Sequence, residues 1–593
     1  AGAGALGAAA GAAVADSSIA NTVTATLGGT LTVTGATTVT AGNSQTSRSD
    51  AFGATVAGGL ALGVSLARSS ADSTVAANYL AGSSLTGTGL AIGATSTGAA
   101  FAAATAGVGG LLLAGAGAQA DATDATAVSA VIGAGASANV GTGAITVSAT
   151  ASPDAKALAK GEVVAGGLAV GAAIAHATVS PLVGAAIEGN AALPASQFTA
   201  GSLSVRATGS VFGDAATDVA ALTGETGDFA RGGQSATASA VSGSGAYYVS
   251  AVGSDARARN TSSVTASVGD HVLISAGTVT ISAVNTTLQG ATASGFTASI
   301  AAAGAVNAQA DAPTHTLASF GDGATVNGSS TGSFTLSASG NDTQIVHAQA
   351  GSGGLYAGSG ATGSTSNDAN VTASLGDGAV VVSGLVTIAA SHDANYASLI
   401  DSLGASAALA RNGADVDVLA TLGAGSRIAA AGPNTAGCYL SSCLQAIALT
   451  SRNAFTQLDL GDSVQAAAGG GINGAGATST TRIDGTSRVD LADDVMLTAG
   501  TSATAAPGPI LVQAWTELTG DDTATLTTGG LLQGAGVSSR YTAIVDNAVT
   551  LGSNDALTSF GVINIGTYTL ANVRAHAYVS TYGLAGVGVA DAD

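Results

Sequence analysis

An internal repeat constrains this chain more than any other feature of its sequence. Residues 264–283 are VTASVGDHVLISAGTVTISA, and residues 371–390 are VTASLGDGAVVVSGLVTIAA. The glycine that closes the first motif recurs after 52, 55 and 47 residues, at Gly269, Gly321, Gly376 and Gly423. A period of about 20–50 residues is typical of proteins that stack one structural unit many times.

Each copy contains two short runs in which Val, Ile and Thr alternate with other residues, such as VTASL (371–375) and LVTIAA (385–390). This alternation indicates strands, and the Gly-Asp and Ser-Gly pairs between the runs indicate turns. Helices are a poor alternative because Gly and β-branched residues are too frequent for helix interiors. We therefore predict an all-β fold.

Small residues limit the thickness of any core, since Gly contributes 87 of 593 residues and aromatic residues only 4%. A unit with one narrow apolar face cannot bury that face alone, whereas stacked copies form a continuous core. The sequence predicts a parallel β-solenoid (β-helix) built from repeats of about 50 residues, with a thin core of Ala, Gly and Val. We expect it to be right-handed, as parallel crossovers generally are. One wide coil per repeat and two coils of about 25 residues both remain open.

The repeat divides the chain into two regions. Residues 1–423 carry regular copies, except that 80 residues separate Gly189 from Gly269. We assign this excess to an extra segment at about 224–260. Residues 424–593 carry divergent copies, which in solenoids cap the stack or contact a partner.

The net charge of −21, from 15 basic and 36 acidic residues, argues against two classes of partner. Nucleic acids and anionic membrane surfaces both require basic patches. The uncharged stretch 83–120 is long enough for a membrane helix, but Gly, Ser and Thr interrupt it throughout. We expect no nucleic-acid binding and no membrane insertion.

The sequence contains no phosphate-binding loop, and its six His are scattered at sites that we interpret as surface or turn positions. We expect no enzymatic activity, no catalytic residues and no cofactor. A carbohydrate-active β-helix lyase or hydrolase is an alternative, although such sites need paired carboxylates and usually aromatic residues. An ice-binding surface is another, because Thr-x-Thr runs occur at 22–40.

One Asp per repeat follows the closing glycine, at Asp270, Asp322 and Asp377. Aspartate is common in turns because its side chain bonds to nearby backbone groups. If the copies stack, these residues would also form an acidic column, whose repulsion a cation would relieve. They are therefore weak candidates for calcium ligands.

The segments VGGLLLAGAGAQA (108–120) and AGGLAVGAAIAHA (165–177), together with the VTASLGDGA and VTISA motifs, resemble repeats of bacterial large exoproteins. These are the filamentous haemagglutinin-like and leukotoxin-like filamentous adhesins. The resemblance implies an exported, elongated β-solenoid at the cell surface or in the biofilm matrix. The expected function is that of a structural and adhesive protein, a rigid rod or filament that contacts surfaces or carbohydrates.

Two further expectations concern assembly and the cysteines. Because neither end of the sequence shows a polar cap, we expect head-to-tail stacking of chains into filaments. The alternative is that neighbouring repeats belong to one longer polypeptide. The loop at 432–445 contains Cys438 and Cys443, and oxidising conditions outside the cell favour a disulfide between them.

Overall fold

The computed structural model describes residues 2–189, 195–209, 235–432, 446–459, 463–502 and 506–593. These residues form strands, turns and connecting segments, with no helix among them. Every strand pairing is parallel except the short contact between β28 (Met496–Ser502) and β29 (Ala506–Pro507). The prediction of an all-β parallel solenoid is confirmed.

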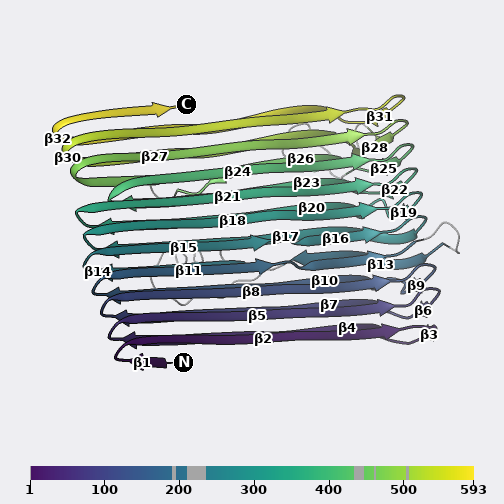
Figure 1. Cartoon of the computed structure of the whole chain (residues 1–593). Helices are drawn as coiled ribbons and strands as arrows, with labels where there is room; N and C mark the ends of the chain where they lie inside the picture. The colour runs from purple at the N-terminus through teal and green to yellow at the C-terminus, as the bar shows by residue number, and fades with distance from the viewer. Residues whose placement is uncertain (1, 190–194, 210–234, 433–445, 460–462, 503–505) are drawn as a thin grey trace.

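Each coil has an outgoing strand, a tight turn, a return strand and, in most coils, a short third strand (Figure 1). The outgoing strands and partial strands are β1 (Gly2–Ala5), β4 (Ala36–Ala57), β7 (Gly89–Gly110), β10 (Ala144–Ala165), β13 (Gln197–Gly209), β14 (Ser235–Ala246), β17 (Leu273–Ala298), β20 (Ser333–Gly353), β23 (Leu385–Leu403) and β26 (Ile447–Gln457). The return strands are β2 (Ala8–Leu27), β5 (Leu60–Tyr79), β8 (Leu113–Ile132), β11 (Leu168–Val179), β12 (Leu182–Ile187), β15 (Val249–Asn260), β16 (Ser263–Val268), β18 (Ala301–Phe320), β21 (Tyr356–Leu375) and β24 (Ala405–Leu422).

The remaining strands complete the coils. In the last coils, single long strands continue around the tight turn, namely β27 (Val464–Leu491), β30 (Ile510–Thr550) and β32 (Ile563–Ala592). The short third strands are β3 (Thr30–Thr32), β6 (Ser84–Thr86), β9 (Ser137–Asn139), β19 (Thr325–Asn327), β22 (Val380–Ser383), β25 (Arg427–Ala430) and β31 (Ala556–Ser559), with β28 in the same column. Stacked return strands form one sheet surface, the return face, and stacked outgoing strands form the outgoing face.

The repeated motifs stack on one another in register. Val264 of the first motif pairs with Thr316, which pairs with Val371 of the later copy. Thr278 likewise pairs with Ser333, which pairs with Leu385. Because copies one repeat apart are direct neighbours, each repeat forms one wide coil.

A wide coil makes the described part of the molecule broader than it is tall. Nine successive pairings link ten strands from β2 to β30 within the described residues. At about 4.8 Å per strand this stack rises roughly 45 Å, whereas β4, with 22 residues, spans roughly 70 Å. These residues therefore form a stack that is broader than it is tall (Figure 1), and the expected elongated rod needs further stacked coils.

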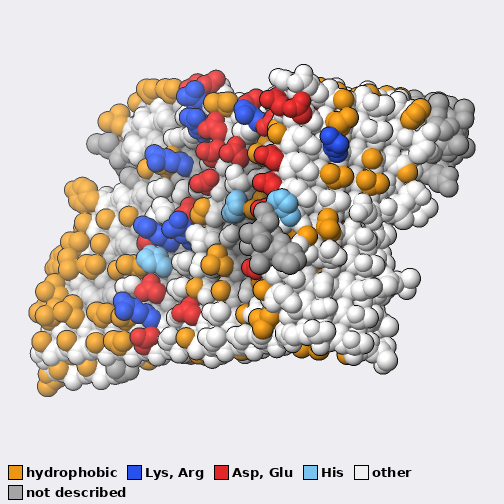
Figure 2. All heavy atoms as spheres, turned by 90° about the vertical axis from the view of Figure 1, so that its right-hand side faces the viewer, with side chains coloured by type: hydrophobic (Ala, Val, Ile, Leu, Met, Phe, Trp, Pro, Cys, Tyr) orange, Lys and Arg blue, Asp and Glu red, His pale blue; other side chains and the backbone are white. Residues whose placement is uncertain are grey.

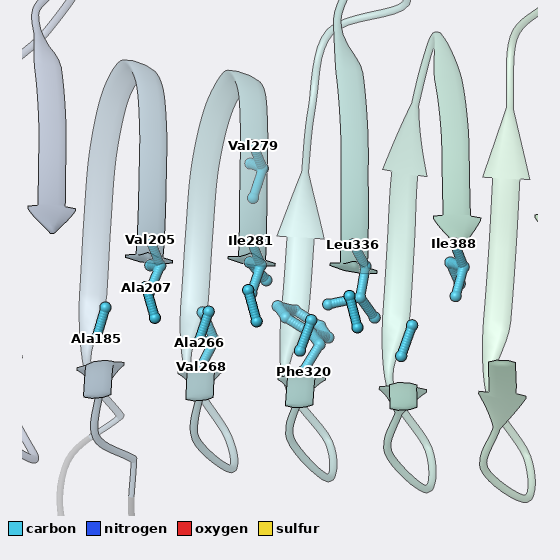
Figure 3. Packing of buried hydrophobic residues seen from close by; sticks show 14 of the residues in the cluster. Ala185, Val205, Ala207, Ala266, Val268, Val279, Ile281, Phe320, Leu336 and Ile388 are labelled. Carbon is cyan, nitrogen blue, oxygen red and sulfur yellow. The ribbon is translucent and has the colours of Figure 1, made fainter. Parts of the chain in front are cut away.

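Two hydrophobic clusters lie inside each coil. The main core, near the short strands, contains Val, Ile, Leu and Phe, and Figure 3 shows Phe320 of β18 directed toward Leu336 of β20. The rings of Phe320 and Phe334 also meet edge-to-face at 5.5 Å. The second cluster, next to the tight turn, consists mostly of Ala. We call this thinner part of each coil the wing.

The tight turn of the wing depends on glycine. A Cβ atom on Gly58 would lie 2.3 Å from the carbonyl oxygen of Leu6, and one on Gly59 would lie 2.4 Å from that of Gly7. The Gly-Gly-Leu sequence at residues 58–60 therefore includes two positions where one coil passes too close to the next for any side chain.

The prediction of an extra segment at about 224–260 is wrong over most of that range. Residues 235–246 form β14, which pairs with β10, and residues 249–260 form β15, which pairs with β11. Strand β13 pairs with the preceding part of β10 and ends at Gly209. The excess residues therefore lie between Gly209 and Ser235, outside the described residues, because a strand can be interrupted without changing the register of either half.

Candidate functional site

The aspartates that follow the closing glycines form a hydrogen-bonded ladder between coils. The carboxylate of Asp270 accepts a 2.9 Å hydrogen bond from the backbone N–H of Asp322. The carboxylate of Asp322 accepts a 2.8 Å hydrogen bond from the backbone N–H of Asp377. The carboxylate of Asp377 accepts the N–H of Ala424 at 2.8 Å. Sequence reasoning identified these positions but assigned their partners to the local turn.

This geometry supplies each proposed calcium ligand with a partner from the protein itself. Among the residues that the structure describes, no group of three or more His, Cys, Asp or Glu side chains is placed to hold a metal ion. The observed role of Asp270, Asp322 and Asp377 is therefore to join coils through backbone amides. Cys438 and Cys443, the expected disulfide, lie outside the described residues.

A charged column crosses the return face at the inner border of the wing (Figure 2). Parallel pairing places Asp16, Arg68, Asp121, His176 and Arg257 on successive strands. Arg68 lies 3.6 Å from Asp121, so opposite charges meet along the stack.

His176 is held between two carboxylates from neighbouring coils. Its Nδ1 lies 3.3 Å from Asp121 and its Nε2 lies 3.4 Å from Asp255. These two hydrogen bonds raise the pKa of His176 to about 9, although partial burial opposes the shift. Burial raises the pKa of Asp121 and of Asp255, but hydrogen bonds, including those from His176, outweigh it and leave both pKa values below their ordinary range.

Sequence reasoning missed this contact because the partners lie 55 and 79 residues from His176 in the chain (176 − 121 and 255 − 176). The only signal that could have found it is the repeat register, extended through the irregular interval after Gly189.

A buried polar seam separates the main core from the wing core. In β20, Phe334, Leu336 and Ala338 belong to the main core, Val346 and Ala348 belong to the wing core, and Asp342 lies between them. The carboxylate of Asp342 accepts hydrogen bonds from Thr287 and Thr314 and lies 2.9 Å from Nε2 of His392.

The same seam continues through other coils. Burial raises the pKa of Asp124 to about 7, although a 2.6 Å hydrogen bond from Thr126 acts to lower the pKa. In a later coil, Asn412 accepts a 2.6 Å hydrogen bond from Ser398 and donates to Thr481 at 3.1 Å. Because these groups are enclosed between two cores, we assign them a structural role.

A polar pocket of about 410 Å³ opens where β26, β30 and β32 meet. Its lining includes Asp521, Asn572 and Arg574. His576 lies 3.5 Å from Asp521 at its border. The volume falls in the usual range for small-molecule sites, about 300–1,000 Å³, and both hydrogen-bond donors and acceptors face it.

An aromatic pair lies farther along the same outgoing face. Trp515 stacks on Tyr568 with ring centroids 5.6 Å apart, and its indole N–H donates to Glu517 at 3.0 Å. Arg452 joins Glu517 to Asp393, with N···O distances of 3.2 and 2.6 Å. Because one face of each ring is turned to its partner, the pair serves first to hold neighbouring coils together.

Within the part of the chain that the structure describes, there is no helix long and apolar enough to cross a membrane. A scan against protein-family models, and searches among curated proteins and solved structures, find no match to this chain. The molecule's function must therefore be inferred from its own geometry.

Proposed function

We propose that this chain is an extracellular structural and adhesive protein, a segment of a filament at the cell surface or in the biofilm matrix. The observation that carries the proposal is the unbroken parallel register from β2 to β30 across the described coils. A fold alone does not establish a function, so the proposal rests on what this ladder can do mechanically.

The ladder ties every coil to the next along two long strands. The pairing of β5 with β8 covers 20 residues of each strand, and that of β4 with β7 covers 22. One coil can separate only if all of these pairings break together or in sequence. Such a stack resists pulling and leaves few backbone segments open to proteases.

The filament grows by adding more coils to the stack. Head-to-tail association of separate chains would achieve this through a contact that does not close on itself. Further repeats in one longer polypeptide would achieve it equally well. Adhesion to surfaces or carbohydrates would use the exposed polar groups of the outgoing and return faces.

The proposal can be tested on cells that produce the protein and on the purified native chain. We expect antibodies to label intact cells, and added protease to remove the label without lysis. Electron micrographs of the native material should show fibres roughly 70 Å wide. A wholly intracellular protein, protected until lysis, would contradict the extracellular assignment, and native material without any fibres would contradict the filament.

A further inference from the structure

The wing carries an apolar surface on its return face. Outward side chains of β2, β5, β8, β11 and β15 beside the tight turn include several large exposed aliphatic residues, namely Val14, Leu62, Val64, Leu168, Val170 and Ile174. The other outward positions on this surface are Ala, Gly, Leu and Val, together with Gln119 on β8 and Asp255 on β15, which both pair with Ile174. We call this surface the wing face.

One charged residue, Asp255 on β15, lies within the wing face, and it contacts His176 and Arg257 of the charged column at 3.4 and 3.0 Å. The inner border of the wing face is the charged column, and Figure 2 shows hydrophobic side chains gathered beyond that column toward the edge of the molecule. The outgoing face of the same wing differs, because Lys160 and Glu162 form an ion pair there at 3.8 Å. The return side of the wing is thus mostly apolar, whereas the outgoing side has an ion pair among its outward side chains.

The wing face is grooved. On β8 the outward positions beside the turn include Gly115 and Gly117, which pair with Leu62 and Val64 of β5. On the other side they pair with Val170 and Ala172 of β11. Larger side chains on β5 and β11 therefore flank a shallow trough at Gly115 and Gly117, between Leu113 and Gln119 of β8, a shape into which a ridge of an identical surface can fit.

The area of the wing face is close to the area that each molecule must bury to form a stable dimer. Five strands about 4.8 Å apart and about eight residues long cover roughly 600 Å². Two such faces together would bury roughly 1,200 Å², the lower bound for specific protein interfaces. Exposed apolar patches of this size on a soluble protein usually mark an interaction site.

We propose that the wing face binds the wing face of a second copy of this chain, so that two stacks lie side by side. The two return faces pack as sheets about 10 Å apart, and the charged column forms the polar rim of the contact. A second copy is the occupant because the ridges and trough are complementary to themselves, and the one charge among them, Asp255, is already paired with His176 and Arg257. The contact is lateral and independent of the proposed head-to-tail growth.

The wing offers a matched pair of variants for the test. Val64 on the wing face is 55% exposed, and Val56 on the outgoing face of the same wing is 63% exposed. Val64→Asp would place a charge inside the proposed contact, whereas Val56→Asp would place the same charge outside it. Both side chains point away from the core, so circular dichroism and melting temperature should stay close to those of the native chain.

Sedimentation equilibrium of the full chain across the micromolar range is the measurement. We expect the native chain and Val56→Asp to form a species of twice the chain mass of 55.2 kDa, with or without longer head-to-tail assemblies beside it. In Val64→Asp this paired species should be lost, with lateral dimer affinity at least about tenfold weaker, the effect of roughly 1.4 kcal/mol. Added NaCl should strengthen the native dimer, because salt screens the repulsion between two chains of net charge −21.

Several outcomes would overturn the proposal. They are a native chain that stays monomeric, a dimer that survives Val64→Asp, and a dimer lost equally in Val56→Asp. If Val64→Asp does not fold, Val170→Lys on β11 replaces it with the same expectation. A monomeric native chain that floats with phosphatidylcholine vesicles would also refute the pairing and assign the wing face to a lipid surface.

Failure of this proposal is separable from failure of the proposed function. Lateral pairing stops at two copies in sedimentation, whereas head-to-tail growth produces a continuing series of masses. Val64→Asp should abolish the first and leave the fibres seen in micrographs.

Discussion

Stacking gives a single side chain partners that lie about one repeat away in the sequence. The carboxylate of Asp322 accepts a hydrogen bond from the backbone N–H of Asp377, and the ring of His176 lies between the carboxylates of Asp121 and Asp255. Each contact joins adjacent coils, so its contribution to stability is a contribution to the cohesion of the stack. Two predictions belong to this scale.

The His176 contact predicts a stability that falls in alkaline solution. Its pKa is about 9 in the folded chain and about 6.5 when unfolded, so its contribution is complete below about pH 6.5 and is lost as the pH rises through 9. The side chain is 39% exposed, and screening by solvent limits the effect to about 1 kcal/mol.

Chemical denaturation between pH 6 and 10, compared with a His176→Gln variant, checks this prediction. The native chain should lose its advantage over the variant above pH 9. Because the pKa values of Asp121 and Asp255 are lowered, their own contribution is lost only in acid, as the pH falls below about 4. An advantage that is unchanged at pH 10 would contradict the assignment.

Replacement of Asp322 separates hydrogen bonding from calcium binding. Asp322→Ala removes the acceptor for the N–H of Asp377 and should cost about 1 kcal/mol of unfolding free energy. Asp322→Asn keeps a side-chain oxygen and should cost less than half as much. Melting curves with calcium and with a chelator should coincide for all three proteins, and a calcium-dependent rise that only Asp322 supports would restore the calcium hypothesis.

The closing glycine ends each return strand because coils approach one another there. A Cβ atom on Gly376 would lie 2.6 Å from the carbonyl carbon of Gly321 and 2.7 Å from the amide nitrogen of Asp322. Both are backbone atoms, so no side-chain rotation can relieve the overlap. A residue without a side chain is therefore required at this point, where Gly376 lies against Gly321 and Asp322 of the preceding coil.

Gly376→Ala should consequently be strongly destabilising, by more than about 2 kcal/mol. Gly360→Ala is the matched control, because a Cβ atom there has no neighbour within 4 Å and the residue also lies in a strand. Urea denaturation of the two variants is the measurement. Equal stability of both would show that the coils can separate locally at low cost.

Breadth is the property of the whole molecule that most affects its proposed role. One coil of about fifty residues adds only about 4.8 Å of height, so the described part measures roughly 70 Å across and 45 Å along the stack. A filament built in this way is wide relative to the height of each coil, and the charged column and the apolar wing face lie on the same side of it (Figure 2).

Small-angle scattering can check this shape on the monomeric Val64→Asp variant. We expect a maximum dimension of roughly 80–90 Å, the diagonal of the stack, with allowance for loops. Two narrow coils per repeat would double the height of the stack to roughly 90 Å and halve its width. A thin, elongated profile would therefore contradict the wide coil.

The sequence by itself determined the all-β fold, the parallel stacking and the register of the VTASV and VTASL motifs. Strand alternation and turn residues can be recognised within a single repeat, and the spacing of the closing glycines Gly321 and Gly376 can be counted along the chain before it is folded. The tertiary structure alone decided the width of the coil, the position of the excess residues before Ser235 and the partners of His176. It also decided which side of the wing is apolar. These features depend on which distant strands become neighbours, and that choice is set by the packing of whole coils, because Ala, Gly and Val of similar size leave many pairings equally acceptable within any one strand.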